Sequence, residues 1–278
     1  THRAEDAFIE TRRKQAAAVR AQGENPFAND VSARGADIAV VRARAGAANA
    51  DGRFAEDSVR AEAGSDPFVV RGRVLALRST GGLSFLRLRD RTGELQLLVS
   101  QALLGADYER LQEIDVGDVV EAEGALMASK RGELSIEPTR LRLVTKALRP
   151  LPEKWHGLTD VELRYRQRYV DLIANPDVAD VFRGRSHIVR AARAILDERG
   201  FLEVETPTMH TLIGGAVAKP FVTHHNTFDM KLFMRIAPEL FLKRLVVGGL
   251  ERVYEIGRCY RNEGISTRHN PEFTMLEF

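Results

Sequence analysis

The chain has 278 residues, of which 44% are hydrophobic and 29% are charged, so it is long enough for two domains with separate cores. Its 41 basic and 39 acidic residues leave a formal net charge of +2, which excludes a protein that holds nucleic acid by bulk charge alone but not one that reads a few bases through shaped contacts. No apolar run is long enough to span a bilayer, so we expect no membrane partner. The single cysteine, Cys259, excludes an internal disulfide and a cysteine-built zinc site, so we expect a cytoplasmic protein.

Residues 1–65 are expected to form an N-terminal helical extension. A helix is predicted over residues 1–23, where Gly23 can serve as the C-terminal cap. Residues 33–64 are rich in Ala, Arg, Gly and Asp and poor in large aliphatic side chains. This composition favours peripheral helices with little core of their own, so we expect a solvated appendage.

Residues 66–147 have the alternation of apolar and polar side chains that is typical of a small β-barrel. Three strands are predicted first, the second and third joined by the turn at residues 90–93, followed by a short helix near residues 108–114 and two longer strands over 119–128 and 133–144. This order is that of an OB-fold, a barrel that binds oligonucleotides. Other small barrels with similar spacing remain compatible with the order alone.

Residues 148–157 are predicted to be a stiff, extended linker, because Pro150 and Pro152 exclude a helix and a central strand. The second domain is expected from residue 158 onward. A helix is predicted up to Gly200, and it runs directly into a strand that ends at Pro207. A further helix is predicted to start at Pro238.

Residues 252–278 are the part of the sequence that is richest in chemistry. Two strands are predicted, over 252–261 and 272–278, with a polar loop between them, and period two places Phe273, Met275 and Glu277 on one face. Such a string offers an arginine for phosphate oxygens, an aromatic face for a base and carboxylates for amines. Each residue taken singly fits a surface hairpin with scattered ion pairs better than a site, but the whole string does not.

The string from Tyr254 to Glu277 resembles motif two of class II aminoacyl-tRNA synthetases, and residues 201–207 with the preceding helix resemble motif one. Among these enzymes the sequence is most similar to bacterial-type lysyl-tRNA synthetases, and the similarity is specific from Leu163 onward. The segments that carry it, besides the two motifs, are residues 163–169, 214–216, 220–226 and 237–240.

The resemblance implies an α+β protein in which an N-terminal OB-fold β-barrel, the anticodon-binding domain at residues 66–147, precedes the start of a class II synthetase antiparallel-sheet catalytic domain at residues 158–278. The implied activity is the ATP-dependent formation of lysyl-adenylate from L-lysine and transfer of lysine to tRNA(Lys) by a homodimer. The sequence ends before a motif three, with which the family binds ATP and Mg²⁺. We therefore expect a partial chain that is inactive alone and contains no metal ligands.

The resemblance also implies roles for residues of the second domain. Arg261 would be the catalytic residue, which holds the ATP α-phosphate and the lysine carboxylate, and Pro207 would lie at the dimer interface. The remaining ATP-binding residues would be Glu263, Arg268, His269, Asn270 and Phe273. Lysine would be bound by Gly215, Glu239, Arg261 and Glu277.

In the barrel, the family's anticodon-reading positions correspond to Arg78, Phe85, Gln96 and Glu133. Phe85 offers a stacking face for a base, and the other three offer hydrogen-bonding groups to base edges. From the alternation alone, Phe85 fits a core aromatic equally well.

Two other functions are compatible with parts of the sequence. An aspartyl or asparaginyl synthetase shares both domains, but those enzymes usually carry a glutamine at the position of Glu239, and Glu277 would repel a substrate carboxylate. A non-catalytic RNA-binding module is the alternative outside the enzymes.

Overall fold

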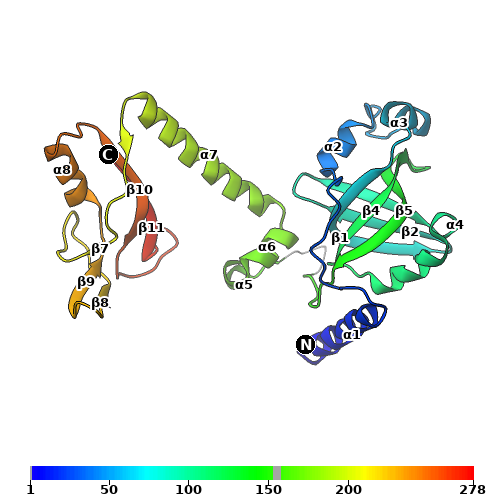
Figure 1. The fold of residues 1–278 in the computed structure, drawn as a ribbon, viewed down its shortest axis with the longest axis horizontal. Helices are drawn as coiled ribbons and strands as arrows, with labels where there is room; N and C mark the ends of the chain where they lie inside the picture. Colours follow the sequence, from blue (N-terminus) through cyan, green and yellow to red (C-terminus); the bar gives the residue numbers. More distant parts are fainter. Residues whose placement is uncertain (1, 153–157) are drawn as a thin grey trace. The chain divides into compact units, whose positions relative to one another are not determined.

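The computed structural model describes residues 2–152 and 158–278, and it divides into two compact units, one up to Ala174 and one from Asn175 to Phe278 (Figure 1). Residues 153–157, the second half of the predicted linker, lie outside the described residues. Within the described part of the chain, no helix is both long and apolar enough to cross a membrane.

The first unit is built around a closed five-stranded barrel, which Figure 1 shows in cyan and green. The strands follow one another around the barrel in the order β1, β2, β3, β5, β4, and β4 pairs with β1 to close it. The pairing of β3 with β5 is parallel, and the other neighbours pair antiparallel. The predicted strand order of an OB-fold is therefore confirmed. The strands are β1 (Phe68–Thr80), β2 (Leu83–Arg89), β3 (Glu94–Ser100), β4 (Val119–Ala128) and β5 (Leu134–Thr145).

Helical segments surround the barrel strands. The long helix α1 confirms the predicted N-terminal helix, and the side chain of Arg12 on it is buried and donates to the carbonyl oxygen of Val116 at 2.9 Å. The helices of this unit are α1 (His2–Ala21), α2 (Ile38–Ala43), α3 (Glu56–Ala63), α4 (Gln101–Leu104), the 3-10 helix η1 (Gly105–Glu113), α5 (Val161–Arg166) and α6 (Arg168–Ala174).

The expectation of a solvated appendage at residues 33–64 is wrong for its few aliphatic residues. Ile38, Val41 and Val59 are fully buried, and they belong to the same hydrophobic cluster as the inward-facing residues of the barrel. The segment has no core of its own, as predicted, but it adds to the core of the barrel. Each of these side chains contributes about 1.5–3 kcal/mol of burial free energy at that site.

The second unit contains a long helix and two small sheets (Figure 1). Its helices are α7 (Asp177–Glu198) and α8 (Glu239–Val247), and its strands are β6 (Leu202–Glu203), β7 (Met209–His210), β8 (Val222–His225), β9 (Met230–Met234), β10 (Val253–Tyr260) and β11 (Glu272–Glu277). One sheet has the order β11, β10, β6 and the other β7, β9, β8. The predicted hairpin is confirmed, since β10 and β11 pair antiparallel, whereas β6 is only two residues long and pairs with β10 in parallel.

A buried ion pair holds the two sheets of this unit together. Arg235, which follows β9, is paired with Glu255 on β10, and both side chains are only 4% exposed. Arg235 also donates to the carbonyl oxygen of Arg258 at 2.7 Å, while the Thr206 hydroxyl donates to Glu255 at 2.6 Å. A Cβ atom on Gly257 would lie 2.1 Å from the Arg235 guanidinium. Glycine is therefore required there because the guanidinium fills the space of a side chain.

Candidate functional site

The β10–β11 hairpin positions the predicted catalytic arginine beside an aromatic ring. The guanidinium carbon of Arg261 lies 5.1 Å from the centroid of the Phe273 ring. The backbone N–H of Arg261 donates to the carbonyl oxygen of Pro271 at 2.8 Å, which fixes the residue at the end of β10. Its side-chain Nε atom is buried and has no hydrogen-bond partner within the described residues. A buried donor without a partner costs about 1–3 kcal/mol, so this atom is suited to an incoming acceptor.

The loop between β10 and β11 carries the other predicted nucleotide contacts. Glu263 accepts from the backbone N–H of Lys219 at 3.3 Å. His269 faces Ser266, with Nδ1 2.8 Å from the Ser266 hydroxyl oxygen. Arg268, His269 and Asn270 are exposed. These three side chains thus lie exposed on the loop of the hairpin, where His269 is held by its contact with Ser266.

Three of the predicted amino-acid contacts converge where α8 begins. Gly215 has a φ of +88°, and a Cβ atom there would lie 3.0 Å from Cβ of Glu239, so the backbone passes close to that carboxylate only because the residue is glycine. Glu239 is half-buried and pairs with Lys243, one helical turn further along α8. Glu277 is half-buried on the inner face of β11, opposite Glu255 in the register of the hairpin.

The electrostatics of this region favour a cationic ligand. Burial, followed by the neighbouring Glu239 and Glu255 carboxylates, raises the pKa of Glu277, and Lys243 and Arg235 offset only part of that effect. No ion pair to Glu277 is found within the described ranges. A half-buried carboxylate that lacks a cation and has a raised pKa is stabilised by the arrival of an ammonium group.

Sequence reasoning missed Arg235, whose burial orders this region. Its partner Glu255 also receives the Thr206 hydroxyl, so the segment that leads to Pro207 is tied to β10. Pro207 itself is exposed, and its carbonyl oxygen lies 2.8 Å from Nε2 of His210. Nothing in the local sequence distinguishes Arg235 from a surface arginine, because its partner is 20 residues away along the chain.

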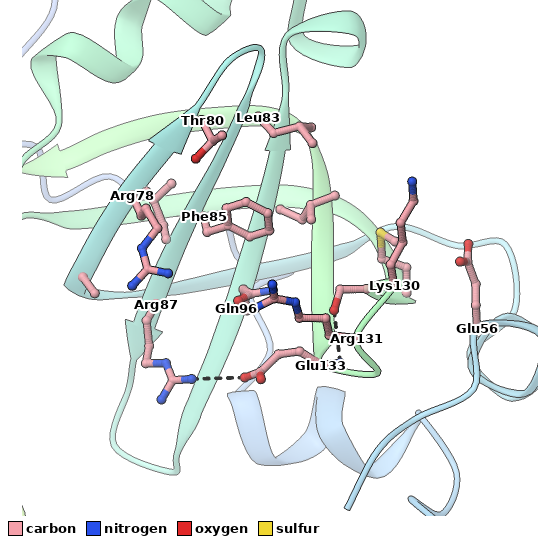
Figure 2. Close-up of a pocket in the computed structure, with 15 residues that line it drawn as sticks. Glu56, Arg78, Thr80, Leu83, Phe85, Arg87, Gln96, Lys130, Arg131 and Glu133 are labelled. Carbon is pink, nitrogen blue, oxygen red and sulfur yellow. Dashed lines mark hydrogen bonds and ion pairs between the residues drawn. The ribbon is translucent and has the colours of Figure 1, made fainter.

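The predicted anticodon residues line one pocket of about 820 Å³ on the outer face of the barrel (Figure 2). In β2 the buried residues are Ser84, Leu86 and Leu88, whereas Phe85 lies on the alternate, outward face. Phe85 is therefore not a core aromatic. It is the register partner of Arg78 on β1, which places these two residues side by side on the pocket wall.

Hydrogen bonds hold the polar side chains of this pocket in place. Nε2 of Gln96 donates to the Ser135 hydroxyl at 3.0 Å. Arg87 donates to Glu133 at 3.1 Å (Figure 2). Gln96 and Glu133 each bring a second polar atom to the pocket lining that can bond to a base edge, whereas Nη1 of Arg87 pairs with Glu94 at 3.6 Å. Sequence reasoning missed Arg87, and it also missed two basic residues of the β4–β5 turn that line the same pocket, Lys130 and Arg131.

Among the residues that the structure describes, no group of three or more His, Cys, Asp or Glu side chains could hold a metal ion.

Comparison with known proteins agrees with this arrangement. Residues 68–144 match a model described as an OB-fold nucleic acid binding domain, and residues 160–278 match tRNA synthetases class II (D, K and N). The chain is 54% identical over 276 residues to a lysine–tRNA ligase of Xylella fastidiosa strain 9a5c, and the alignment covers 98% of this chain and 53% of that protein. It is 61% identical over 207 residues to a lysine–tRNA ligase of Moorella thermoacetica, covering 74% of this chain and 42% of that protein.

The barrel and the hairpin site together define the class. The chain belongs to the class II tRNA synthetases, with an OB-fold domain ahead of the synthetase domain. The Xylella fastidiosa relative, which matches nearly the whole length of this chain, is named a lysine–tRNA ligase, as is one from Xanthomonas campestris pv. campestris strain 8004 at 52% identity. The chain spans about half the length of these curated relatives.

Proposed function

We propose that the protein carrying this chain is a lysine–tRNA ligase, which activates L-lysine with ATP and transfers it to the 3′ end of tRNA(Lys). The observation that carries the proposal is the pair of neighbouring carboxylates Glu239 and Glu277, in the unit that also holds the buried Nε of Arg261 without a hydrogen-bond partner. An amino acid with two ammonium groups and one carboxylate matches that set of charges.

In the first step, a lysine carboxylate oxygen attacks the α-phosphorus of ATP, a P–O bond forms, and pyrophosphate leaves with the electrons of the bond that breaks. Arg261 binds the α-phosphate and the attacking carboxylate together, which removes the repulsion between two anions and stabilises the charge on the phosphoryl oxygens. Phe273 stacks on adenine with the ring face that Arg261 leaves free. Glu263 accepts from the adenine amino group, and Arg268, His269 and Asn270 close over the outer phosphates.

Selection of lysine rests on the carboxylates. The Gly215 carbonyl oxygen and Glu239 receive the α-ammonium group, and Glu239 pairs with Lys243 on the same helix. Glu277 receives the ε-ammonium group, which supplies the cation that this half-buried carboxylate lacks. An aspartate or asparagine substrate would leave Glu277 without a partner, and the aspartate side chain would be repelled by it.

In the second step, the 3′-terminal ribose hydroxyl of tRNA(Lys) attacks the carbonyl carbon of the adenylate, the ester bond forms and AMP leaves. The OB-fold selects the tRNA by binding the uridine-rich anticodon of tRNA(Lys). Phe85 stacks on a base, while Arg78, Gln96 and Glu133 bond to base edges from the walls of the same pocket.

We also propose a cytoplasmic homodimer that uses Mg²⁺ with ATP. Support for the dimer comes from α7, where Val181, Ile188 and Ile195 recur every seven residues and are 72%, 72% and 48% exposed. Apolar side chains at that spacing form a stripe that needs a cover, and β6 and then Pro207 follow the same helix along the chain. Sedimentation equilibrium that returned only monomers at micromolar concentration would contradict this part of the proposal.

The test of the activity is ATP–pyrophosphate exchange by the protein that carries these residues, with lysine, aspartate or asparagine as the amino acid. Exchange that depends on lysine alone is the expected result. Exchange with aspartate or asparagine would favour the sister enzymes of the class, and no exchange with any of the three would favour a non-catalytic RNA-binding protein.

A further inference from the structure

A second cavity, of about 430 Å³, lies beside the pocket of Phe85 on the barrel. Its wall is formed by the segment before α3 and by the β4–β5 turn, and Lys130 and Arg131 line both cavities. The second cavity is lined by Ala47, Ala48, Asn49, Arg53, Phe54, Ala55, Ser58, Lys130, Arg131 and Gly132.

The charge of this cavity has one sign. Arg53, Lys130 and Arg131 are exposed, the lining contains no carboxylate, and no ion pair to any of the three is found in the described ranges. The carboxylates of the neighbouring pocket are already neutralised: Glu56 pairs with Arg60 at 2.6 Å and Glu133 with Arg87 at 3.1 Å. The cavity therefore favours an anionic ligand, because its lining holds three cations and no acidic side chain.

Backbone contacts hold the two walls in a fixed arrangement. The backbone N–H of Phe54 donates to the carbonyl oxygen of Gly132 at 2.9 Å, and Asn49 caps the segment by accepting from the N–H of Arg53 at 2.8 Å. Gly132 has a φ of +79°, and a Cβ atom there would lie 2.6 Å from Cβ of Arg53. The turn that carries the two shared basic residues therefore packs directly on the segment that carries Arg53.

Figure 2 shows the two shared side chains diverging from the turn: Arg131 points into the Phe85 pocket toward Gln96, whereas Lys130 extends away from it. One cavity offers an aromatic face and groups that bond to base edges, and the neighbouring cavity offers cations. This arrangement matches a nucleic-acid strand, in which bases alternate with phosphates.

We propose that Arg53, Lys130 and Arg131 bind the phosphate backbone of the RNA strand whose base stacks on Phe85. This inference rests on the proposed anticodon function of the barrel and adds a sequence-independent site next to the base-reading one. The site contributes affinity and register, and Phe85 and Gln96 contribute discrimination between sequences.

The test is the salt dependence of RNA binding by the protein that carries this chain, measured by fluorescence anisotropy with a tRNA(Lys) transcript and with a transcript whose anticodon uridines are replaced. Each phosphate contact to a single strand contributes about 0.7 to the slope of log Kd against log salt concentration. Lys130→Ala/Arg131→Ala should therefore lower the slope by about 1.4, and adding Arg53→Ala should lower it by about 2.1 in total. The ratio of the two transcripts' Kd values should stay unchanged.

Matched variants separate this site from general charge effects. Lys14→Ala/Arg140→Ala removes two exposed cations that line neither cavity and should leave the slope as in the wild type. Lys130→Arg/Arg131→Lys keeps both positive charges and should also give the wild-type slope. Equal slopes for the wild type and Lys130→Ala/Arg131→Ala would overturn the proposal. If the wild type failed to discriminate between the transcripts while the variant still lost slope, the backbone site would stand and the anticodon function would be wrong. No binding of either transcript would overturn both.

Discussion

Glu277 illustrates how much of a site a single residue's periodicity can predict. Alternation along the last strand placed Phe273, Met275 and Glu277 on one face, and in the structure these three are half-buried while Glu272, Thr274 and Leu276 are exposed. Among the described residues no arginine forms an ion pair with Glu277, which argues against the competing possibility that Glu277 pairs with an arginine to hold the sheet. The arginine that holds the sheet is Arg235, and it pairs with Glu255.

Replacing Glu277 by Gln should lower kcat/KM for lysine in pyrophosphate exchange by about two to four orders of magnitude, because removing one partner of a buried charge pair costs about 3–5 kcal/mol. The preference for lysine over norleucine, which lacks the ε-ammonium, should narrow, while the KM for ATP should change little. An unchanged lysine-to-norleucine ratio, together with a lower melting temperature, would instead assign Glu277 a purely structural role.

The raised pKa of Glu277 predicts the pH dependence of lysine binding. Below that pKa the carboxyl group is neutral and cannot pair with an ammonium, so lysine affinity should rise with pH from the ordinary carboxyl value of 4.5 upward. For the free protein the sign is opposite. A raised acid pKa means that the folded state holds the proton more tightly, so the contribution of Glu277 to stability falls as pH rises through the same window.

Isothermal titration calorimetry with lysine between pH 4.5 and 8 measures this dependence. Glu277→Gln is the matched control and should give a flatter profile at lower affinity. A wild-type profile as flat as that of the variant would remove Glu277 from the lysine site.

Phe85→Ala should weaken binding of tRNA(Lys) by about 1–3 kcal/mol, the usual contribution of stacking one base. Lysine-dependent exchange should not change, because Phe85 is in the barrel unit and the proposed exchange residues are in the other. Its outward position also predicts a melting temperature close to that of the wild type, unlike Leu86→Ala, which truncates a fully buried neighbour. A loss of exchange equal to the loss of aminoacylation would show that Phe85 is needed for the fold instead.

At the scale of elements, strands with clear alternation could be predicted and short or irregular ones could not. The barrel strands and the final hairpin have several alternating positions each, so the pattern rises above chance. The sheet of β7, β8 and β9 was not predicted, since it has strands of two, four and five residues. The burial of Ile38, Val41 and Val59 was missed because isolated aliphatic residues in a polar segment give no periodicity.

The β10 strand depends on a glycine for its packing, and this can be tested directly. Gly257→Ala should lower stability by about 1–3 kcal/mol, the usual cost of overpacking, because the added methyl group meets the buried Arg235 guanidinium. The matched control is Gly264→Ala in the β10–β11 loop, where a Cβ atom would meet nothing within 4 Å. Urea unfolding compares the two, and equal midpoints would contradict the packing described here.

For the whole molecule, the fold and class follow from the order of its parts, whereas the finer site chemistry follows from contacts between distant residues. A barrel of the OB-fold order and a hairpin that presents arginine, aromatic and carboxylate groups were both visible as sequence patterns. The Arg235–Glu255 pair could not be seen in the sequence, and neither could the cluster of Arg53, Lys130 and Arg131. In both, residues that are separated along the chain come together.

Aminoacylation of tRNA by the protein that carries this chain tests the central claim, since it requires lysine activation and tRNA selection in the same molecule. With radiolabelled lysine, aspartate and asparagine, and with tRNA(Lys) transcripts that keep or lose the anticodon uridines, we predict esterification of lysine alone and a marked loss of rate on the altered transcript. Charging with aspartate or asparagine, or equal lysine charging of both transcripts, would contradict the account.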